Sequence, residues 1–152
     1  MPDSTSIQPL VLDEELCSEC IDINPMAVLG DAAGPGYVVA TDFVVRDSSR
    51  RFWVGQYHDM IKVFDQTGKF LRQVGRAGGG PMEFRSPLPI YVDGASRVHV
   101  LDPGNSKETV ITSAFSLHNE QRMDVAVWGA VPLLDGSGYI VNAVVQTSSG
   151  IG

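Results

Sequence analysis

Short sequence patterns recur in this chain at intervals of about 45 residues. Two glycine-led patterns, which begin at Gly30 and Gly75, stand 45 positions apart, and each runs into a Gly-Pro step. Two aspartate-led patterns, which begin at Asp47 and Asp93, stand 46 positions apart, and each contains an Arg before an apolar run. A third copy begins at Asp135, 42 positions beyond Asp93. This spacing predicts a repeat protein.

The stretch 61–85 indicates what one repeat contains. Apolar residues at Ile61, Val63 and Phe70 mark two short strands on either side of Asp65-Gln66-Thr67-Gly68, which is turn chemistry, so a β-hairpin is expected. The glycines and the proline of Gly75–Pro81 cannot continue a strand, so the chain must cross to a new sheet there. A repeat of this length made of four short strands is typical of a β-propeller blade.

The predicted fold is all-β, a β-propeller of which this chain holds only a part. At 152 residues the chain is too short for a closed ring, because even four blades of this length need about 180 residues. We therefore expect a truncated reading frame or a unit that completes itself with another copy. Residues 1–9 are expected to be disordered and 10–152 to form a partial propeller domain. Its expected parts are an outer strand with its crossover at 21–37, full blades at 41–74 and 88–122, and an incomplete blade at 131–152.

Within these blades the pattern also predicts individual strands. Leu10–Leu12 and Ile21–Leu29 are expected as strands, and Val131–Leu134 as the inner strand of the third blade. Phe84 is expected to plug the gap between two blades, with a structural ion pair among the charges Glu83 and Arg85 beside it.

Composition argues against two classes of partner. The net charge is −7, and the 11 basic residues are scattered along the chain, so binding to a nucleic-acid backbone has little support. No apolar run is long enough to span a membrane, and Met1–Pro9 lacks a basic region followed by an apolar one, as a signal peptide would have. We expect no nucleic acid and no membrane span, and the sequence leaves the cellular location open.

Three short motifs suggest chemistry, and each also has a structural interpretation. Cys17 and Cys20 could be structural or unpaired, could form a local disulfide in an exported protein, or could bind a metal. His58 beside Asp59 could act as a general base, or could cap backbone groups in a turn. The segment Arg76–Pro81 lacks the Lys-Ser/Thr that closes a phosphate-binding loop, so its glycines are expected to let the crossover pack flat.

Several segments resemble NHL repeats. These are Asp102–Lys107, Val110-Ile111, and Ile61–Asp65 with Gly68–Arg72. Cys17-x-x-Cys20, Leu29-Gly30-Asp31, Val74-Gly75-Arg76 and Gly80-Pro81-x-Glu83-Phe84 look like the bacterial six-bladed β-propeller proteins of the NHL type. The resemblance covers roughly residues 16–146. It implies an NHL-type β-propeller, with this chain about half of a six-bladed ring, and an exported or cell-envelope protein. Met82 stands where the family usually has Gly, and Glu108 stands where it has an apolar residue.

The family analogy favours a non-catalytic scaffold that binds a protein, peptide or glycan at the rim formed by the loops between strands and blades. The residues expected on that rim are His58, Asp59, Arg76, Glu83, Asp102, Asn105 and Lys107. No catalytic residue, metal ligand or cofactor is predicted from them. The alternative is a hydrolase or lyase that resembles lactonase-like or amidating-lyase propellers, which would hold a divalent cation in the channel of a complete ring. An exposed blade face also predicts self-association.

Overall fold

The computed structural model describes residues 26–39, 43–56, 60–133 and 137–144. Expectations about Leu10–Leu12, Cys17 and Cys20, and the pair His58 and Asp59, lie outside these residues. Within them the structure is almost entirely β, which confirms the predicted fold class.

Two four-stranded antiparallel sheets form the first and second blades. Each is a meander in which consecutive strands pair, in the orders β1-β2-β3-β4 and β7-β8-β9-β10. The strands of the first blade are β1 (Val44–Arg46), β2 (Phe52–Val54), β3 (Ile61–Phe64) and β4 (Phe70–Val74). Those of the second blade are β7 (Leu88–Val92), β8 (Val98–Asp102), β9 (Lys107–Ile111) and β10 (Leu117–Arg122).

The third blade begins with the antiparallel pair β11 (Ala126–Pro132) and β12 (Tyr139–Val144). Between the first and second blades the crossover contains a short parallel pair, β5 (Arg76–Ala77) and β6 (Glu83–Phe84). A single 3-10 turn, η2 (Pro103–Asn105), joins β8 to β9.

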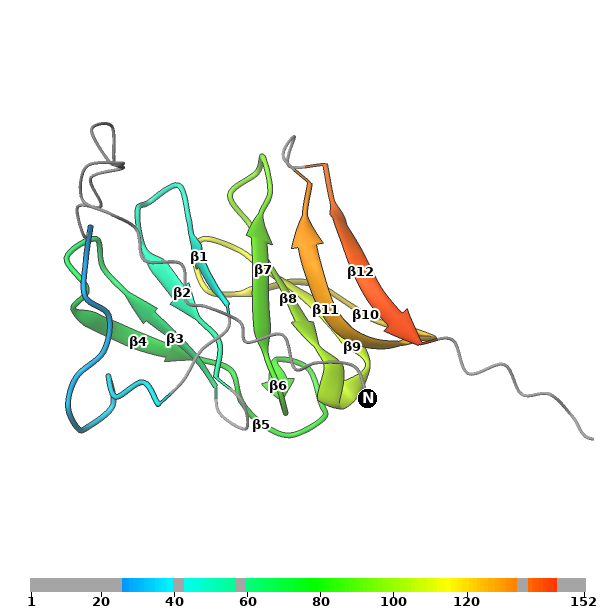
Figure 1. Cartoon of the computed structure of the whole chain (residues 1–152), viewed down its shortest axis with the longest axis horizontal. Coiled ribbons are helices and arrows are strands. Elements are labelled where there is room, and N and C mark those ends of the chain that lie inside the picture. The colour runs from blue at the N-terminus through cyan, green and yellow to red at the C-terminus, as the bar shows by residue number, and fades with distance from the viewer. Residues whose placement is uncertain (1–25, 40–42, 57–59, 134–136, 145–152) are drawn as a thin grey trace, which may run out of the picture.

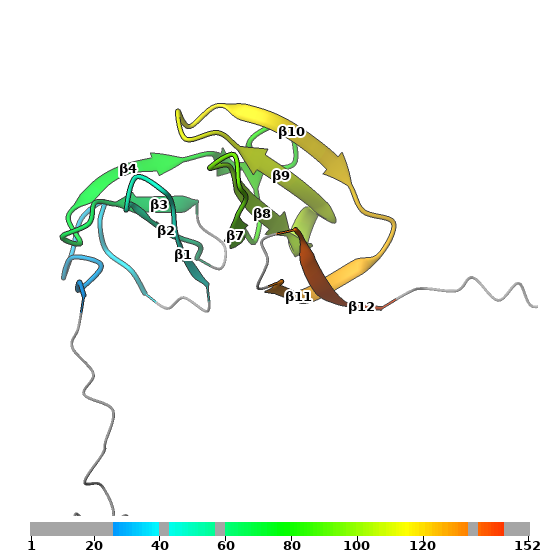
Figure 2. The ribbon, with the colours of Figure 1, turned by 90° about the horizontal axis from the view of Figure 1, so that it is seen from above.

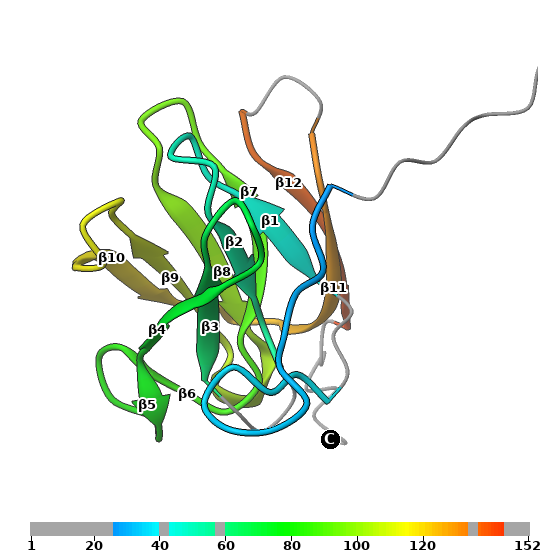
Figure 3. The ribbon, with the colours of Figure 1, turned by 90° about the vertical axis from the view of Figure 1, so that its left-hand side faces the viewer.

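The three sheets stand side by side in an arc. Figures 1 and 2 show β1, β7 and β11 on the concave side and β4 and β10 on the convex side, as expected for blades around a central axis. Figure 3 shows that the loops β1–β2 and β7–β8 point to one end of the molecule, while β5 and β6 lie at the other. We call these ends the hairpin face and the crossover face.

Two strands differ from the expectation. The inner strand of the third blade begins at Ala126, before the expected Val131, because the pairing shifts register between Val127 and Gly129 and the strand continues through the irregularity. The described part of the expected outer strand, Met26–Leu29, is irregular. It packs closely on the first blade, where a Cβ on Gly68 would lie 2.0 Å from the carbonyl oxygen of Val28.

Four of the connections between paired strands in the two full blades use the same five-residue turn. In each, the first residue and the fifth are joined by a backbone hydrogen bond, and the fourth donates its N–H to the carbonyl of the first. The fourth residue has a positive φ, which explains the glycine in one of the turns. These fourth residues are Arg50 (63°), Gly68 (91°), Ser96 (63°) and Phe115 (66°).

The aspartate-led repeats begin two of these turns and stabilise them in the same way. Asp47 Oδ1 accepts a hydrogen bond of 2.9 Å from the backbone N–H of Arg51, and Asp47 Oδ2 accepts one of 2.7 Å from its Nε. Asp93 makes the same two contacts with Arg97, at 2.9 and 2.7 Å. The recurrence at Asp47 and Asp93 therefore marks a turn in which one carboxylate holds both backbone and side chain.

The first and second blades share one apolar core. It contains Trp53, Ile61, Val63 and Val74 from the first blade, Phe84 from the crossover, and Val98, Val100 and Ile111 from the second blade. Phe115, from a turn of the second blade, stacks on Trp53 with ring centroids 5.3 Å apart. Phe84 is buried in this core, so the expectation that it plugs the gap between blades is confirmed.

The crossover enters through a glycine that no other residue could replace without strain. Gly75 has a φ of 80°, and a Cβ at this position would lie 2.3 Å from a ring carbon of Phe84. Gly30, its counterpart one repeat earlier, has a φ of 98° and lies against Val38 in the same way. Met82 has a φ of 56°, a backbone conformation that glycine adopts more readily than methionine.

We predict that Gly75→Ala lowers the free energy of unfolding by about 2 kcal/mol or more, because the methyl group meets Phe84 and the backbone conformation is unfavourable for alanine. Urea denaturation measures the change. Gly94→Ala is the matched control, because a Cβ there has no atom within 4 Å, and it should alter stability by less than about 0.5 kcal/mol. Equal effects of the two substitutions would contradict this account of Gly75.

Candidate functional site

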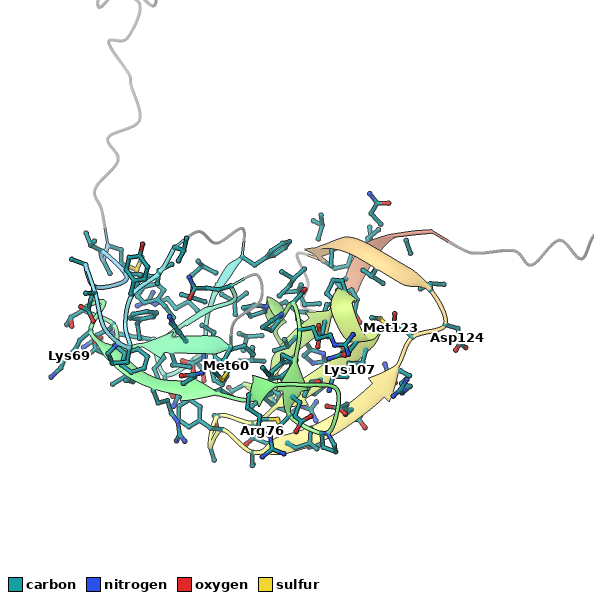
Figure 4. The ribbon with its side chains drawn as sticks, turned by 90° about the horizontal axis from the view of Figure 1, so that it is seen from below. Met60, Lys69, Arg76, Lys107, Met123 and Asp124 are labelled. Atoms are coloured by element: carbon teal, nitrogen blue, oxygen red, sulfur yellow. The ribbon has the colours of Figure 1, made fainter. Side chains whose placement is uncertain are left out.

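Five of the seven predicted rim residues lie together on the crossover face. Arg76 and Glu83 belong to the crossover strands β5 and β6, whereas Asp102, Asn105 and Lys107 surround the turn η2. Figure 4 shows Arg76 and Lys107 close to each other beside the crossover, with Lys69 at the far edge of the first blade. Packing of the crossover against the β8–β9 connection brings these two segments together.

Asp102 is the buried anchor of this site. Its side chain is 0% exposed, and its two oxygens accept backbone hydrogen bonds from Arg85 at 3.0 Å and Ser86 at 2.9 Å. Asn105 Nδ2 donates to Asp102 Oδ2 and to the carbonyl oxygen of Gly78, both at 2.7 Å. The β8–β9 connection is thereby tied to the middle of the crossover and to the residues that directly follow it.

A second anchor comes from the ion pair of the buried Lys107 with the partly buried Glu120. Lys107 Nζ donates to Glu120 Oε2 at 2.9 Å and to the carbonyl oxygen of Gly80 at 2.8 Å. Glu120 Oε2 also accepts from Thr109 Oγ1 at 3.0 Å. Burial raises the pKa of Glu120, but the hydrogen bonds from Lys107 and Thr109 lower it by more, so the pKa lies below its ordinary value. Sequence reasoning missed Glu120, although its place opposite Thr109 on the outer strand could have indicated it.

Arg76 and Glu83 form the ion pair of the crossover. The parallel register places them directly opposite, and the Arg76 guanidinium lies 2.7 Å from Glu83 Oε1. The partner of Glu83 is therefore Arg76, which the register brings alongside, and not Arg85, two positions further along the chain. Glu83 Oε2 also accepts from the backbone N–H of Gly80 at 2.8 Å. The hydrogen bonds from Gly80 and Arg76 lower the pKa of Glu83.

These contacts divide the rim residues into two groups. The first group is Asp102, Asn105 and Lys107, whose polar side-chain atoms form hydrogen bonds with the backbone in and just after the crossover. The side chain of Arg76 is 76% exposed, which leaves it available to a ligand. Whether any of these residues binds a ligand stays a prediction.

A separate polar cluster lies between the second and third blades. His99 Nδ1 is 2.8 Å from Glu108 Oε1, and His99 Nε2 is 3.4 Å from Asp93 Oδ2. Gln121 Nε2 donates to Glu108 Oε2 at 2.8 Å. Tyr91 stacks on His99 with ring centroids 4.2 Å apart, and the ring of Tyr139, on the third blade, lies 5.6 Å from that of Tyr91. Glu108 is therefore bonded to side chains from the two strands that flank it, β8 and β10.

The environment of the cluster shifts several pKa values. Burial raises the pKa of Glu108, but the hydrogen bonds from His99 and Gln121 lower it more, so the net direction is downward. Burial also raises the pKa of Asp93, but the hydrogen bonds from Arg97 lower it by more, so this carboxyl has a pKa of about 2. Burial and the nearby charge of Glu108 raise the pKa of Tyr139. At neutral pH the cluster thus holds ionised carboxylates beside a neutral tyrosine.

Comparison of the two full blades shows that members of this polar cluster occupy positions that are apolar in the first blade. The paired residues Trp53 and Val63 correspond to His99 and Val110, and the paired residues Ile61 and Val74 correspond to Glu108 and Gln121. The sequence carried two signals of this change, because His99 stands in the place of Trp53 and Glu108 in an apolar position. What the sequence did not show is that the two replacements touch.

Other features complete the description of this part of the chain. Among the described residues, no group of three or more His, Cys, Asp or Glu side chains is placed to hold a metal ion. In that same part of the chain no helix is long and apolar enough to span a membrane. An open, mostly apolar hollow of about 360 Å³ lies between Phe43 and the strands β11 and β12.

We predict that Asp102→Ala lowers the free energy of unfolding by about 3 kcal/mol, because it leaves the backbone N–H groups of Arg85 and Ser86 without their acceptor. Urea denaturation followed by tryptophan fluorescence measures this. The control is Asp124→Ala, which removes an exposed carboxylate on the same face and should cost less than about 0.5 kcal/mol. If Asp102→Ala were as mild as the control, Asp102 would not anchor the crossover.

Comparison with known proteins agrees with the observed arrangement of blades. A crystal structure of a Bacteroides fragilis protein, named only as a candidate exported protein, superposes with a TM-score of 0.58 at 22% sequence identity. The match covers 71% of this chain and 31% of that protein, so this chain spans about a third of its length. No curated protein matches the sequence. The family described as 6-bladed beta-propeller matches residues 44–142, and the chain therefore belongs to that family.

Proposed function

We propose that this chain is part of a non-catalytic β-propeller scaffold of the NHL type, which binds a protein, peptide or glycan on its crossover face. Residues 10–152 would form the partial propeller domain of the scaffold. The observation that carries the proposal is the glycine-rich crossover 75–84, whose backbone is held by the side chains of Asn105 and Lys107 from the next blade.

A loop that is already ordered binds without a large loss of conformational entropy. The carbonyl oxygens of Gly78 and Gly80 are occupied by Asn105 and Lys107, so the glycines of this loop are not free to rearrange. The loop presents Arg76 on its outer side, oriented by Glu83. A preorganised arginine of this kind suits a ligand with a carboxylate or another acidic group.

Neighbouring side chains support the same class of ligand. Arg85 and Arg122 are exposed, and Arg122 lies opposite Lys107 at the crossover end of β10. The face therefore carries three exposed arginines in a protein whose net charge is −7. Acidic peptides or acidic glycans are the ligands that these charges favour.

Binding selections test the proposal. A phage-displayed peptide library and an array of acidic glycans would be screened against the purified chain. We expect binders that lose at least about tenfold in affinity with Arg76→Glu, because the substitution repels an acidic group and breaks the pair with Glu83. The matched control, Lys69→Glu, changes the same charge at the far edge of the first blade and should keep the affinity.

Two results would contradict the scaffold. One is a set of binders that respond to Lys69→Glu as strongly as to Arg76→Glu, which would make the attraction non-specific. The other is a rise in the melting temperature with calcium or zinc, which is what the alternative, a metal-dependent hydrolase or lyase, predicts for a cation that binds only the folded state.

We also propose that the chain associates with a second copy through the outer face of the third blade. Val131 and Ile140 are cross-strand partners on that face and are 67% and 65% exposed. At the opposite end of the arc, Val28 and Val39 are 80% and 76% exposed. In this protein, apolar sheet faces pack on the faces of neighbouring blades, as the core between the first two blades shows.

Light scattering after size exclusion tests the association. We expect the chain to have at least twice its monomer mass of 16.4 kDa, and we expect the double substitution of Val131→Lys and Ile140→Lys to shift it toward monomer. Leu117→Lys is the control, because Leu117 is an exposed leucine on the outer strand β10, away from that face. A chain that is monomeric at all concentrations, or a double variant of unchanged mass, would overturn the proposal.

We further propose an exported or cell-envelope location. It is supported by the NHL-type resemblance and by the name of the Bacteroides fragilis protein, which describes a candidate for export.

A further inference from the structure

The negative charge of this chain is concentrated before its first blade. Residues 1–45 contain eight of the 18 acidic residues and none of the 11 basic ones, so the rest of the chain, with ten acidic and 11 basic side chains, has a net charge of +1. Five of the eight carboxylates lie within ten positions, which we call the acidic segment: Asp13, Glu14, Glu15, Glu19 and Asp22. Carboxylates this close repel one another, so the segment gains free energy wherever cations lie within a Debye length.

The first blade has the opposite charge. Its described residues, 43–56 and 60–74, include six basic side chains and two acidic ones. Both carboxylates are engaged within their own turns, because Asp47 holds Arg51 and Asp65 accepts hydrogen bonds from backbone N–H groups of the β3–β4 turn. The blade therefore presents an excess of positive charge.

Exposed cations of this blade lack a carboxylate partner. No ion pair among the described residues includes Arg50, Lys69 or Arg72, and all three are exposed. Arg51, of the β1–β2 turn, and Arg72, of β4, lie over the same ring, that of Phe115, at 4.5 and 4.6 Å from its centroid, so the turn and the strand adjoin. A guanidinium stacked on a ring still has the N–H donors at its edge for a carboxylate.

The described chain begins beside these cations. The backbone of Val28 packs on the β3–β4 turn at Gly68. Figures 1 and 2 show the first described segment, in dark blue, alongside that turn. Asp22 and Asp13 stand four and 13 positions before Met26, so even a fully extended chain carries them at most about 13 Å and about 45 Å from it. The acidic segment therefore reaches the first blade without a long linker.

We propose that the acidic segment folds back on the turns of the first blade and forms ion pairs with Arg50, Lys69 and Arg72. Exposed ion pairs are individually weak. A tethered segment, however, has an effective concentration of about a millimolar, so several weak pairs together hold it in place. Arg50 belongs to the hairpin face, so this contact does not depend on the binding site proposed for the crossover face.

Paramagnetic relaxation enhancement tests the contact in the full chain. Cys17 and Cys20 are the two cysteines of the sequence and both lie in the acidic segment, so Cys20→Ser leaves Cys17 as the attachment point for a nitroxide. We expect the nitroxide to broaden the backbone N–H signals of the β1–β2 turn and β4 more strongly than those of β5 and β6. In 1 M sodium chloride, where the Debye length is about 3 Å, this excess broadening should be lost.

Substitutions on each side separate an electrostatic contact from simple proximity. Amides in place of the five carboxylates should remove the excess broadening without altering any contact between described residues: Asp13→Asn, Glu14→Gln, Glu15→Gln, Glu19→Gln and Asp22→Asn. From the blade side, Arg50→Glu combined with Arg72→Glu should have the same effect. Because Arg72 also stacks on Phe115, the melting temperature of this variant is measured, and the amide variant decides if it does not fold.

The matched control is Arg76→Glu combined with Arg122→Glu, which makes the same change of charge on the crossover face and should leave the broadening as it is. The proposal is overturned by equal broadening at both ends of the molecule, by broadening that the amide variant retains, or by a control that releases the segment as completely as the first-blade variant. Broadening of an isotope-labelled chain by a second copy that carries the nitroxide would also overturn it, because the contact would then join two molecules.

Discussion

The packing of one blade face on the next is the interaction on which this structure depends. A four-stranded blade has two faces and cannot bury either by itself, so Trp53, Ile61 and Val63 leave water only because the second blade supplies Val98, Val100 and Ile111. The turns, crossovers and connections serve to place these faces against each other. The crossover does so most directly, because it carries Phe84 into the shared core and is itself held by Asp102 and Lys107 of the following blade.

The same blade geometry supports joints of two kinds. Between the first and second blades the contact is apolar. Phe115, which has a positive φ of 66°, stacks on Trp53 at this contact. Between the second and third blades the contact is also apolar, but the second blade carries a polar cluster centred on Glu108 beside it. An apolar contact is indifferent to pH, whereas a buried carboxylate that accepts several hydrogen bonds is sensitive to its own protonation.

Much of the fold could be predicted because its signals are local. The turn residues from Asp65 to Gly68, the glycine steps at Gly30 and Gly75, and the period of about 45 residues each report on chain segments a few residues long. Prediction failed where a strand departs from regular pairing. The β11 strand begins at Ala126 because its ladder tolerates a shift of register at Gly129, and no local pattern announces such a shift.

The sequence alone was sufficient for the all-β class, the blade repeat, the hairpin turns and the burial of Phe84, since each follows from the residues at and beside the position concerned. Only the tertiary structure could decide which charges meet. Arg76 pairs with Glu83 through a parallel bridge, Lys107 reaches a carbonyl 27 residues away, and Glu108 meets His99 on the neighbouring strand. The physical reason is that strand register and blade packing set these distances, and both arise from contacts between segments far apart in the chain.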